Sequence, residues 1–214
     1  MENRFRKFAV VAGLLVAVLA LSGCVIFLGG DGLPLSHSPL ARGVWHGDRF
    51  ENEWTGMYLY MPLGFHSLLP QSSERRVAPM VTEEVRGVED FFIANEDFTV
   101  IIAMHMLDVS RGHLRGYSAE DYLNGVWGEL QENPDRIRNR GDFETAYVAG
   151  RQYVLMRSDF ADAETPEYIR FQDSYAHRWV NTMLIFIVTY DYGYEELAAA
   201  VLEAIGHGWQ LTQN

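Results

Sequence analysis

The sequence predicts an α+β fold, a mostly antiparallel β-sheet with helices on its faces. Two observations favour this class: most of the chain consists of short apolar runs joined by turn residues, and only two segments have apolar residues at helical spacing. The chain has 214 residues, of which 48% are apolar, so it can bury the core of one domain of ordinary size without a disulfide. Its one cysteine is Cys24.

The first 23 residues have the form of an export signal. A basic start precedes an apolar run from Phe8 to Ala20, which is short for a membrane-spanning helix. The segment from Leu21 to Cys24 resembles the lipobox of bacterial lipoproteins, in which small residues precede the lipid-bearing cysteine. The alternative is an uncleaved anchor helix from about Phe8 to Leu28. In both cases the basic start stays in the cytoplasm, so the domain lies outside.

The lipobox resemblance implies cleavage between Gly23 and Cys24, with acyl chains on Cys24 as the membrane anchor. Residues 24–43, rich in Gly, Ser and Pro, are then expected to be a flexible tether, and residues 44–214 a single globular domain. The position after the cysteine is not Asp, which favours the outer membrane if the cell has two membranes.

The charge of the chain is strongly acidic. It carries 17 Lys and Arg against 29 Asp and Glu, and the signal contains three of the former and one of the latter, so the mature chain has 14 against 28. Diffuse negative charge repels nucleic acid and anionic lipid surfaces, which argues against either as a partner. The sequence therefore predicts the lipid anchor and an envelope protein as partners, and no nucleic acid.

The first half of the domain is expected to contain a hairpin and two longer strands. The hairpin is centred on Thr55-Gly56 and closed by Pro62. Two β-rich runs follow between Glu89 and Asp108, divided at Asn95-Glu96-Asp97. The second run is nearly continuous in apolar residues, as in a central strand that is covered on both faces.

A helix is expected next, beginning at Ser118, where a Ser followed three residues later by an acid resembles a capping box, and ending at Asn133-Pro134. Strands are then expected at 143–148, 152–160, 168–179 and 182–190, the last being the most apolar run of the domain. A second helix from Tyr194 to Ile205 is predicted to bury its apolar residues and end at Gly206; these residues are Leu197, Val201, Leu202 and Ile205.

The segment from Gly47 to Phe65 resembles the opening of a group of small lipoproteins of Gram-positive bacteria. In that group an aromatic-x-Asn strand, a Gly turn and a Pro-x-Gly-aromatic close recur after a lipobox. The same opening resembles the PsbP-like α-β-α sandwich, although Met57 and Phe65 depart from the usual residues. The resemblance implies that fold and a binding or assembly role, and it brings no catalytic residues.

Strong catalytic and metal motifs are absent from the sequence, so no catalytic residue, metal or cofactor is predicted. A weaker alternative is a hydrolase or solute-binding accessory that uses the loop from Ser110 to His113 or the acidic pairs Glu83-Glu84 and Glu89-Asp90. His105 and its neighbours Met104 and Met106 have side chains that would suit a soft metal ion. On a strand, however, His105 points away from the face of its two methionine neighbours, so packing is the preferred interpretation.

Aromatic residues are the best candidates for a recognition surface, because Tyr and Trp are enriched in interface hot spots. The candidates cluster near the start and the end of the domain; they are Trp45, Tyr58, Tyr60, Tyr190, Tyr192 and Tyr194. The alternative is that these residues pack in the core or at a sheet edge. The sequence therefore favours a non-enzymatic, lipid-anchored binding or assembly module on the outer side of a membrane.

Overall fold

The computed structural model describes residues 40, 42–68, 87–110, 112–131, 137–162 and 165–207. The predicted signal, the lipidation site at Gly23 and Cys24, most of the tether and the Glu83-Glu84 pair lie outside these residues. Among the described residues, no helix is long and apolar enough to cross a membrane.

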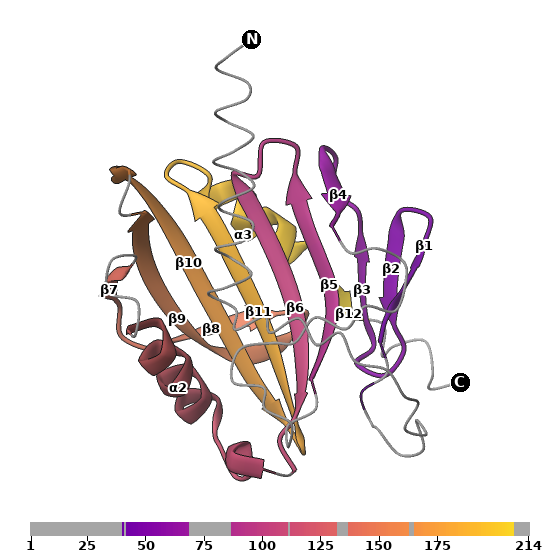
Figure 1. Ribbon diagram of the computed structural model, residues 1–214. Helices are drawn as coiled ribbons and strands as arrows, with labels where there is room; N and C mark the ends of the chain where they lie inside the picture. The colour runs from indigo at the N-terminus through magenta and orange to yellow at the C-terminus, as the bar shows by residue number, and fades with distance from the viewer. Residues whose placement is uncertain are drawn as a thin grey trace, which may run out of the picture.

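Of the two sheets formed by the described residues, the larger has eight strands, all paired antiparallel (Figure 1). Their order is β4-β5-β6-β11-β10-β9-β7, and β8 also pairs with β9. The strands are β4 (Phe65–Ser67), β5 (Gly87–Asn95), β6 (Val100–Asp108), β7 (Ile137–Arg140), β8 (Glu144–Val148), β9 (Arg151–Asp162), β10 (Thr165–Trp179) and β11 (Thr182–Asp191).

The smaller sheet has four strands in the order β1-β2-β3-β12. They are β1 (Val44–His46), β2 (Arg49–Asn52), β3 (Met57–Tyr60) and β12 (Gly206–His207). The predicted hairpin forms β2 and β3. Its inner residues, Phe50, Met57 and Leu59, are buried in the core shared with the large sheet.

Strands β6 and β11 lie at the centre of the large sheet and are apolar on both faces. Every residue of β6 is buried, which confirms the expectation of a central covered strand. Alternate residues enter different clusters: Met104 and Met106 pack with the small sheet, and Leu107 packs on the opposite face. The sheet can therefore be stable only if both of its faces are covered.

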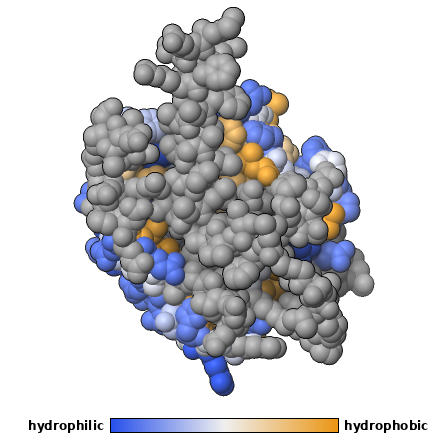
Figure 2. Space-filling model, viewed as in Figure 1, coloured by the Kyte–Doolittle hydropathy of each residue, from blue (hydrophilic) through white to orange (hydrophobic). Residues whose placement is uncertain are grey.

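Helix α2 (Ala119–Gln131) covers one face of the large sheet. It begins with the predicted capping box: Ser118 Oγ accepts from the Asp121 amide at 3.0 Å, and Asp121 Oδ2 accepts from the Ser118 amide at 2.9 Å. Its buried side chains Tyr122, Leu123 and Val126 pack in the cluster on that face. The outward side of this part of the molecule is mostly hydrophilic, at the lower left of Figure 2.

Helix α3 (Glu195–Glu203) covers the other face, behind the sheet in Figure 1. Its buried residues are Ala198, Val201 and Leu202, with Ile205 just beyond. The prediction that Leu197 is buried was wrong, because Ala198 occupies the core-facing position and Leu197 is 38% exposed. Helices on both faces of an antiparallel sheet confirm the predicted α+β class.

A buried carboxylate, Asp90, joins the start of the domain to both sheets. It lies beside an irregularity in β5, between Glu89 and Phe91, and is 2% exposed. Its Oδ1 accepts from the Gly43 amide at 2.6 Å, and its Oδ2 accepts from Asn52 Nδ2 at 2.8 Å. Asp90 therefore fixes the small sheet, and the chain that precedes it, on the first long strand of the large sheet.

Residues next to Gly43 also contact the domain, although the sequence places them in the tether. Leu40 is 7% exposed and belongs to the core cluster, and Arg42 Nε donates to the Glu89 carbonyl at 3.0 Å. A side chain at Gly43 would overlap the Phe50 ring. The folded part therefore includes at least Leu40, Arg42 and Gly43.

The pH dependence of stability tests the burial of Asp90. Burial raises the pKa of this carboxyl to about 7. The folded state then holds a proton that the unfolded state loses above its ordinary pKa, so stability falls as pH rises from about 4 to 7. The unfolding free energy decreases by roughly 2–4 kcal/mol over this range.

Urea unfolding of the wild type and Asp90→Asn, across this pH range, measures the effect. Burial lowers the pKa of His105 to about 4, which gives a slope of opposite sign below pH 6.5. Both proteins contain His105, so its contribution cancels when the unfolding free energy of the variant is subtracted from that of the wild type. We expect the wild type to lose stability relative to the variant as pH rises, and parallel curves would contradict this assignment.

Candidate functional site

The aromatic residues proposed from the sequence fall into separate groups. Tyr58 and Tyr60 lie on the outer face of the small sheet, where the Arg49 guanidinium carbon is 5.3 Å and 5.4 Å from their ring centroids. Tyr60 is 54% exposed. Trp45 lies on the inner face, with its ring centroid 5.3 Å from that of Phe50. Trp45 is therefore part of the core packing and is left out of the candidate surface.

The second group lies where β11 leads into α3. Tyr190 is 8% exposed and stacks on Phe171 at 5.6 Å, so it too belongs to the interior. Tyr192 and Tyr194 are 81% and 37% exposed, and Tyr168 of β10 is exposed beside them. We call Tyr168, Tyr192 and Tyr194 the tyrosine surface. Tyr168 was not among the sequence candidates.

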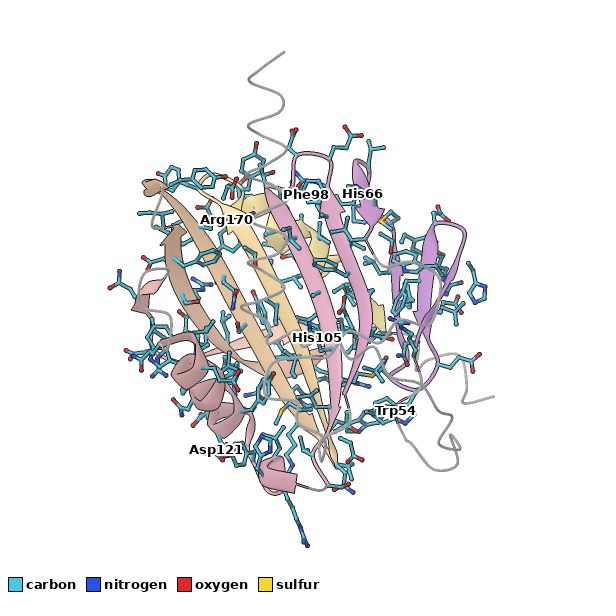
Figure 3. All side chains as sticks on the ribbon, in the orientation of Figure 1. Trp54, His66, Phe98, His105, Asp121 and Arg170 are labelled. Carbon is cyan, nitrogen blue, oxygen red and sulfur yellow. The ribbon has the colours of Figure 1, made fainter. Side chains whose placement is uncertain are left out.

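A buried ion pair holds the tyrosine surface in place. Arg170 is 3% exposed, and its Nε is 2.7 Å from Asp191 Oδ1. Its Nη2 donates to the Phe98 carbonyl at 2.8 Å, which ties β10 to the β5–β6 turn (Figure 3). The Tyr168 hydroxyl donates to the other oxygen of Asp191. Asp191 thus binds one guanidinium and one phenol that come from the same strand.

The titration of Tyr168 agrees with its role as a donor. Burial, followed by the hydrogen bond to Asp191, raises the pKa of the phenol to about 12. The hydroxyl therefore stays protonated at physiological pH and can donate continuously to the carboxylate.

Backbone contacts stabilise the same region. The Asp191 amide donates to the Thr99 carbonyl at 2.9 Å, and the Tyr194 amide donates to the Asp191 carbonyl at 3.1 Å. Phe98 has φ = 56°, which costs a non-glycine residue of order 1–3 kcal/mol. Because its carbonyl receives Arg170, this strained turn is part of the support. A surface held in this way loses little conformational entropy on binding.

Acidic residues surround the tyrosine surface. Glu96 and Asp97 are exposed on the β5–β6 turn, and Glu195 and Glu196 are exposed in the first turn of α3. The buried Arg170 is neutralised by Asp191 and adds no exposed positive charge. The tyrosine surface therefore suits a partner that offers basic groups around an apolar or aromatic centre.

The catalytic alternatives are not assembled by the described residues. Ser110 Oγ donates to Asp108 Oδ1 at 2.5 Å, and His113 is exposed on the short helix η1 (Gly112–Leu114). Glu89 and Asp90 lie on opposite faces of the sheet. Glu89 is opposite His105 in the register of β5 and β6, whereas Asp90 contacts Asn52 on the other face. Neither motif therefore forms a convergent site.

His105 lies on the face opposite to Met104 and Met106, as predicted. It is 3% exposed, and its Nδ1 has no hydrogen-bond partner among the described residues. No group of three or more His, Cys, Asp or Glu in the described part of the chain is arranged to hold a metal. His105 is a buried neutral imidazole at physiological pH, because burial lowers its pKa to about 4.

One polar cluster was not predicted from the sequence. Asp173 of β10 is 7% exposed; Arg157 Nε is 3.8 Å from its Oδ2, and the Tyr175 hydroxyl is 3.5 Å from the same oxygen. Burial raises the pKa of Asp173. These contacts join β9 and β10. The sequence did not indicate this cluster, because the pairing of Arg157 with Asp173 depends on the register between the two strands.

Substitution of Arg170 tests how the tyrosine surface is supported. In Arg170→Met the Asp191 carboxylate stays buried without its cation, and we expect a loss of roughly 3–5 kcal/mol in unfolding free energy. Tyr168→Phe removes one donor and should cost about 1 kcal/mol. Urea denaturation measures both. Equal and small losses would show that the ion pair does not support this region.

No protein-family model matches the chain, and no curated protein matches it. The chain is similar to several solved structures, among them the following two. The solution structure of cyanobacterial PsbP from Synechocystis sp. PCC 6803 has 12% identity and a TM-score of 0.43, over 84% of this chain and 98% of its own. The crystal structure of LpqN from Mycobacterium tuberculosis, described as involved in cell envelope biogenesis, has 14% identity and a TM-score of 0.38, over 70% and 83%.

Proposed function

We propose that the protein is a lipid-anchored, extracytoplasmic binding module that presents the tyrosine surface to a basic partner in the cell envelope. The observation that carries the proposal is the tyrosine surface itself, with Tyr192 81% exposed beside the buried Arg170–Asp191 pair. Exposed tyrosines on a rigid support have the character of an interface hot spot.

The anchor is supported by the sequence of residues 1–24. The signal and the lipobox-like segment ending at Cys24 support a domain outside the cytoplasm that is attached through acyl chains. Which membrane carries the anchor depends on the cell: the residue after Cys24 favours the outer membrane where there are two.

A binding role is preferred to a catalytic one because the polar groups near the tyrosine surface are engaged with one another. Arg170, Asp191 and Tyr168 form a closed set of contacts. A general acid or base needs a proton that can pass to a substrate within hydrogen-bond reach. The exposed part of this region consists of phenol rings and carboxylates, which suit recognition of a basic surface.

Replacement of the lipidation cysteine tests the anchor. In Cys24→Ala the thiol that accepts the diacylglyceryl group is absent, so incorporation of a labelled fatty acid should be abolished. Labelling and mass measurement of the wild type in parallel distinguish the two forms of attachment. A labelled wild-type chain that lacks residues 1–23 supports the lipid anchor. An unlabelled wild-type chain that keeps residues 1–23 would instead establish the uncleaved anchor helix.

Photo-crosslinking at Tyr192 tests the tyrosine surface. The chain has no lysine after Lys7, so amine-reactive reagents would miss the domain, and a photoreactive amino acid is the suitable probe. We expect the probe at Tyr192 to capture one envelope protein in living cells. The same probe at Tyr147, which is 71% exposed on β8, is the control.

A second variant separates binding from folding. Tyr194→Ala should reduce the Tyr192 cross-link about tenfold, as loss of a hot-spot side chain costs about 1.4 kcal/mol or more, and should leave the unfolding midpoint nearly unchanged. Equal capture at Tyr192 and Tyr147, or capture that Tyr194→Ala leaves intact, would rule out this surface as the binding site.

A further inference from the structure

Turns from distant parts of the sequence meet at the end of the domain opposite the tyrosine surface. They are the β2–β3 turn with Trp54, the β8–β9 turn at Ala149-Gly150, and the β10–β11 turn with Val180. Strand β11 separates the two ends: Val180 precedes it and Tyr192 follows it, roughly 30 Å apart for a strand of this length. Figure 3 shows Trp54 at one end and Arg170 and Phe98 at the other.

Aromatic and arginine contacts hold these turns together. The ring centroids of Trp54 and Trp179 are 4.9 Å apart, and the Arg151 guanidinium carbon is 4.7 Å from the Trp179 ring. Arg151 Nη2 also donates to the Thr55 carbonyl at 2.8 Å. Three hairpins that are distant in sequence therefore form one surface, which we call the turn end: Trp54, Trp179 and Val180.

Val180 is the most prominent apolar residue of the turn end. It is 74% exposed and has φ = 54°, an unfavourable conformation for a β-branched residue. Arg178 Nε donates to its carbonyl at 3.2 Å, and the Val109 amide donates to the Asn181 carbonyl at 2.8 Å. The turn is thus held so that an apolar side chain projects into the surroundings.

The chain that leads from Cys24 reaches the domain at this same end. Gly43 binds Asp90, Asp90 binds Asn52, and Asn52 Oδ1 accepts from the Thr55 amide at 2.8 Å, next to Trp54. One hydrogen-bonded series therefore connects the start of the domain to the turn end.

The length of the intervening chain also favours this end as the nearer one to the membrane. Fifteen residues separate Cys24 from Leu40. A flexible chain of this length has a root-mean-square span of about 20 Å, which is less than the length of β11.

Both signs of charge occur at the turn end. Arg42, Arg151 and Arg178 lie around it, and Arg178 Nη1 donates to the Tyr117 carbonyl at 2.6 Å. Of the nearby acids, Asp90 and Asp108 are buried and hydrogen-bonded, whereas Glu53 and the first acids of α2, Glu120 and Asp121, are exposed. The case for a lipid surface at this end therefore rests on the tryptophans, Val180 and the position of the incoming chain, and not on net charge.

We propose that the turn end rests on the lipid surface in which Cys24 is anchored. Trp54 and Trp179 would lie at the level of the headgroups, Val180 would enter the outer part of the apolar layer, and the arginines would meet phosphate groups. This inference rests on the lipid anchor of the proposed function and adds an orientation. The tyrosine surface then faces away from the membrane.

A pair of single-cysteine variants of the full-length lipidated protein tests the orientation. Cys24 is the only cysteine and is blocked by acylation, so a cysteine placed at Val180 or Tyr192 is the one free thiol. Each variant carries the same environment-sensitive fluorophore and is reconstituted in vesicles of phosphatidylcholine and phosphatidylglycerol. Lipids with a nitroxide on the headgroup report contact with the bilayer, and labelled fatty acid reports the anchor in the same sample.

We expect the probe at Val180→Cys to shift to shorter wavelength and lose most of its emission to nitroxide lipids, with the probe at Tyr192→Cys unchanged. Adding Trp54→Ala to the first variant should reduce this quenching. An acylated protein whose Val180 probe stays in water would overturn the orientation and leave the anchor standing, whereas a chain that is not acylated would overturn both. Shielding of Val180 in native membranes but not in vesicles would assign the turn end to a protein and contradict the proposal.

Discussion

The structure depends on one buried carboxylate, because Asp90 joins three parts of the molecule that no continuous strand connects. It receives the Gly43 amide from the start of the domain and Asn52 Nδ2 from the small sheet, while it belongs itself to the large sheet. Both of its oxygens accept hydrogen bonds, which favours the charged form, and its burial favours the neutral form. The position of the small sheet, and with it that of Trp54, follows from this contact.

The resulting domain is polarised along its strands. One end carries aromatic and arginine side chains near Asn52, which Asp90 links to Gly43, and the other carries exposed tyrosines among acids. The two ends are supported differently: Arg151 connects turns at the first, and the Arg170–Asp191 pair connects turns at the second. In the proposed module, this separation would keep the lipid attachment and the partner-binding surface apart.

Much of the fold could be predicted from sequence because its signals are local. The apolar run of β6, the capping box at Ser118 and the hairpin at Thr55-Gly56 each specify an element without knowledge of its neighbours. The division into two sheets could not be predicted, since it depends on long-range strand pairing such as that of β12 with β3. The exposure of the aromatic residues could not be predicted either. Trp45 packs on Phe50 and Tyr190 on Phe171, whereas Tyr192 lies just beyond the end of β11 and faces solvent.

Hydrogen exchange of the full-length lipidated protein, in vesicles and in detergent micelles, tests the polarity of the domain most directly. We expect slower amide exchange in vesicles at residues 177–183, around Val180, and unchanged exchange at residues 191–196, around Tyr192. Slower exchange at the second segment, or no difference at either, would contradict this expectation.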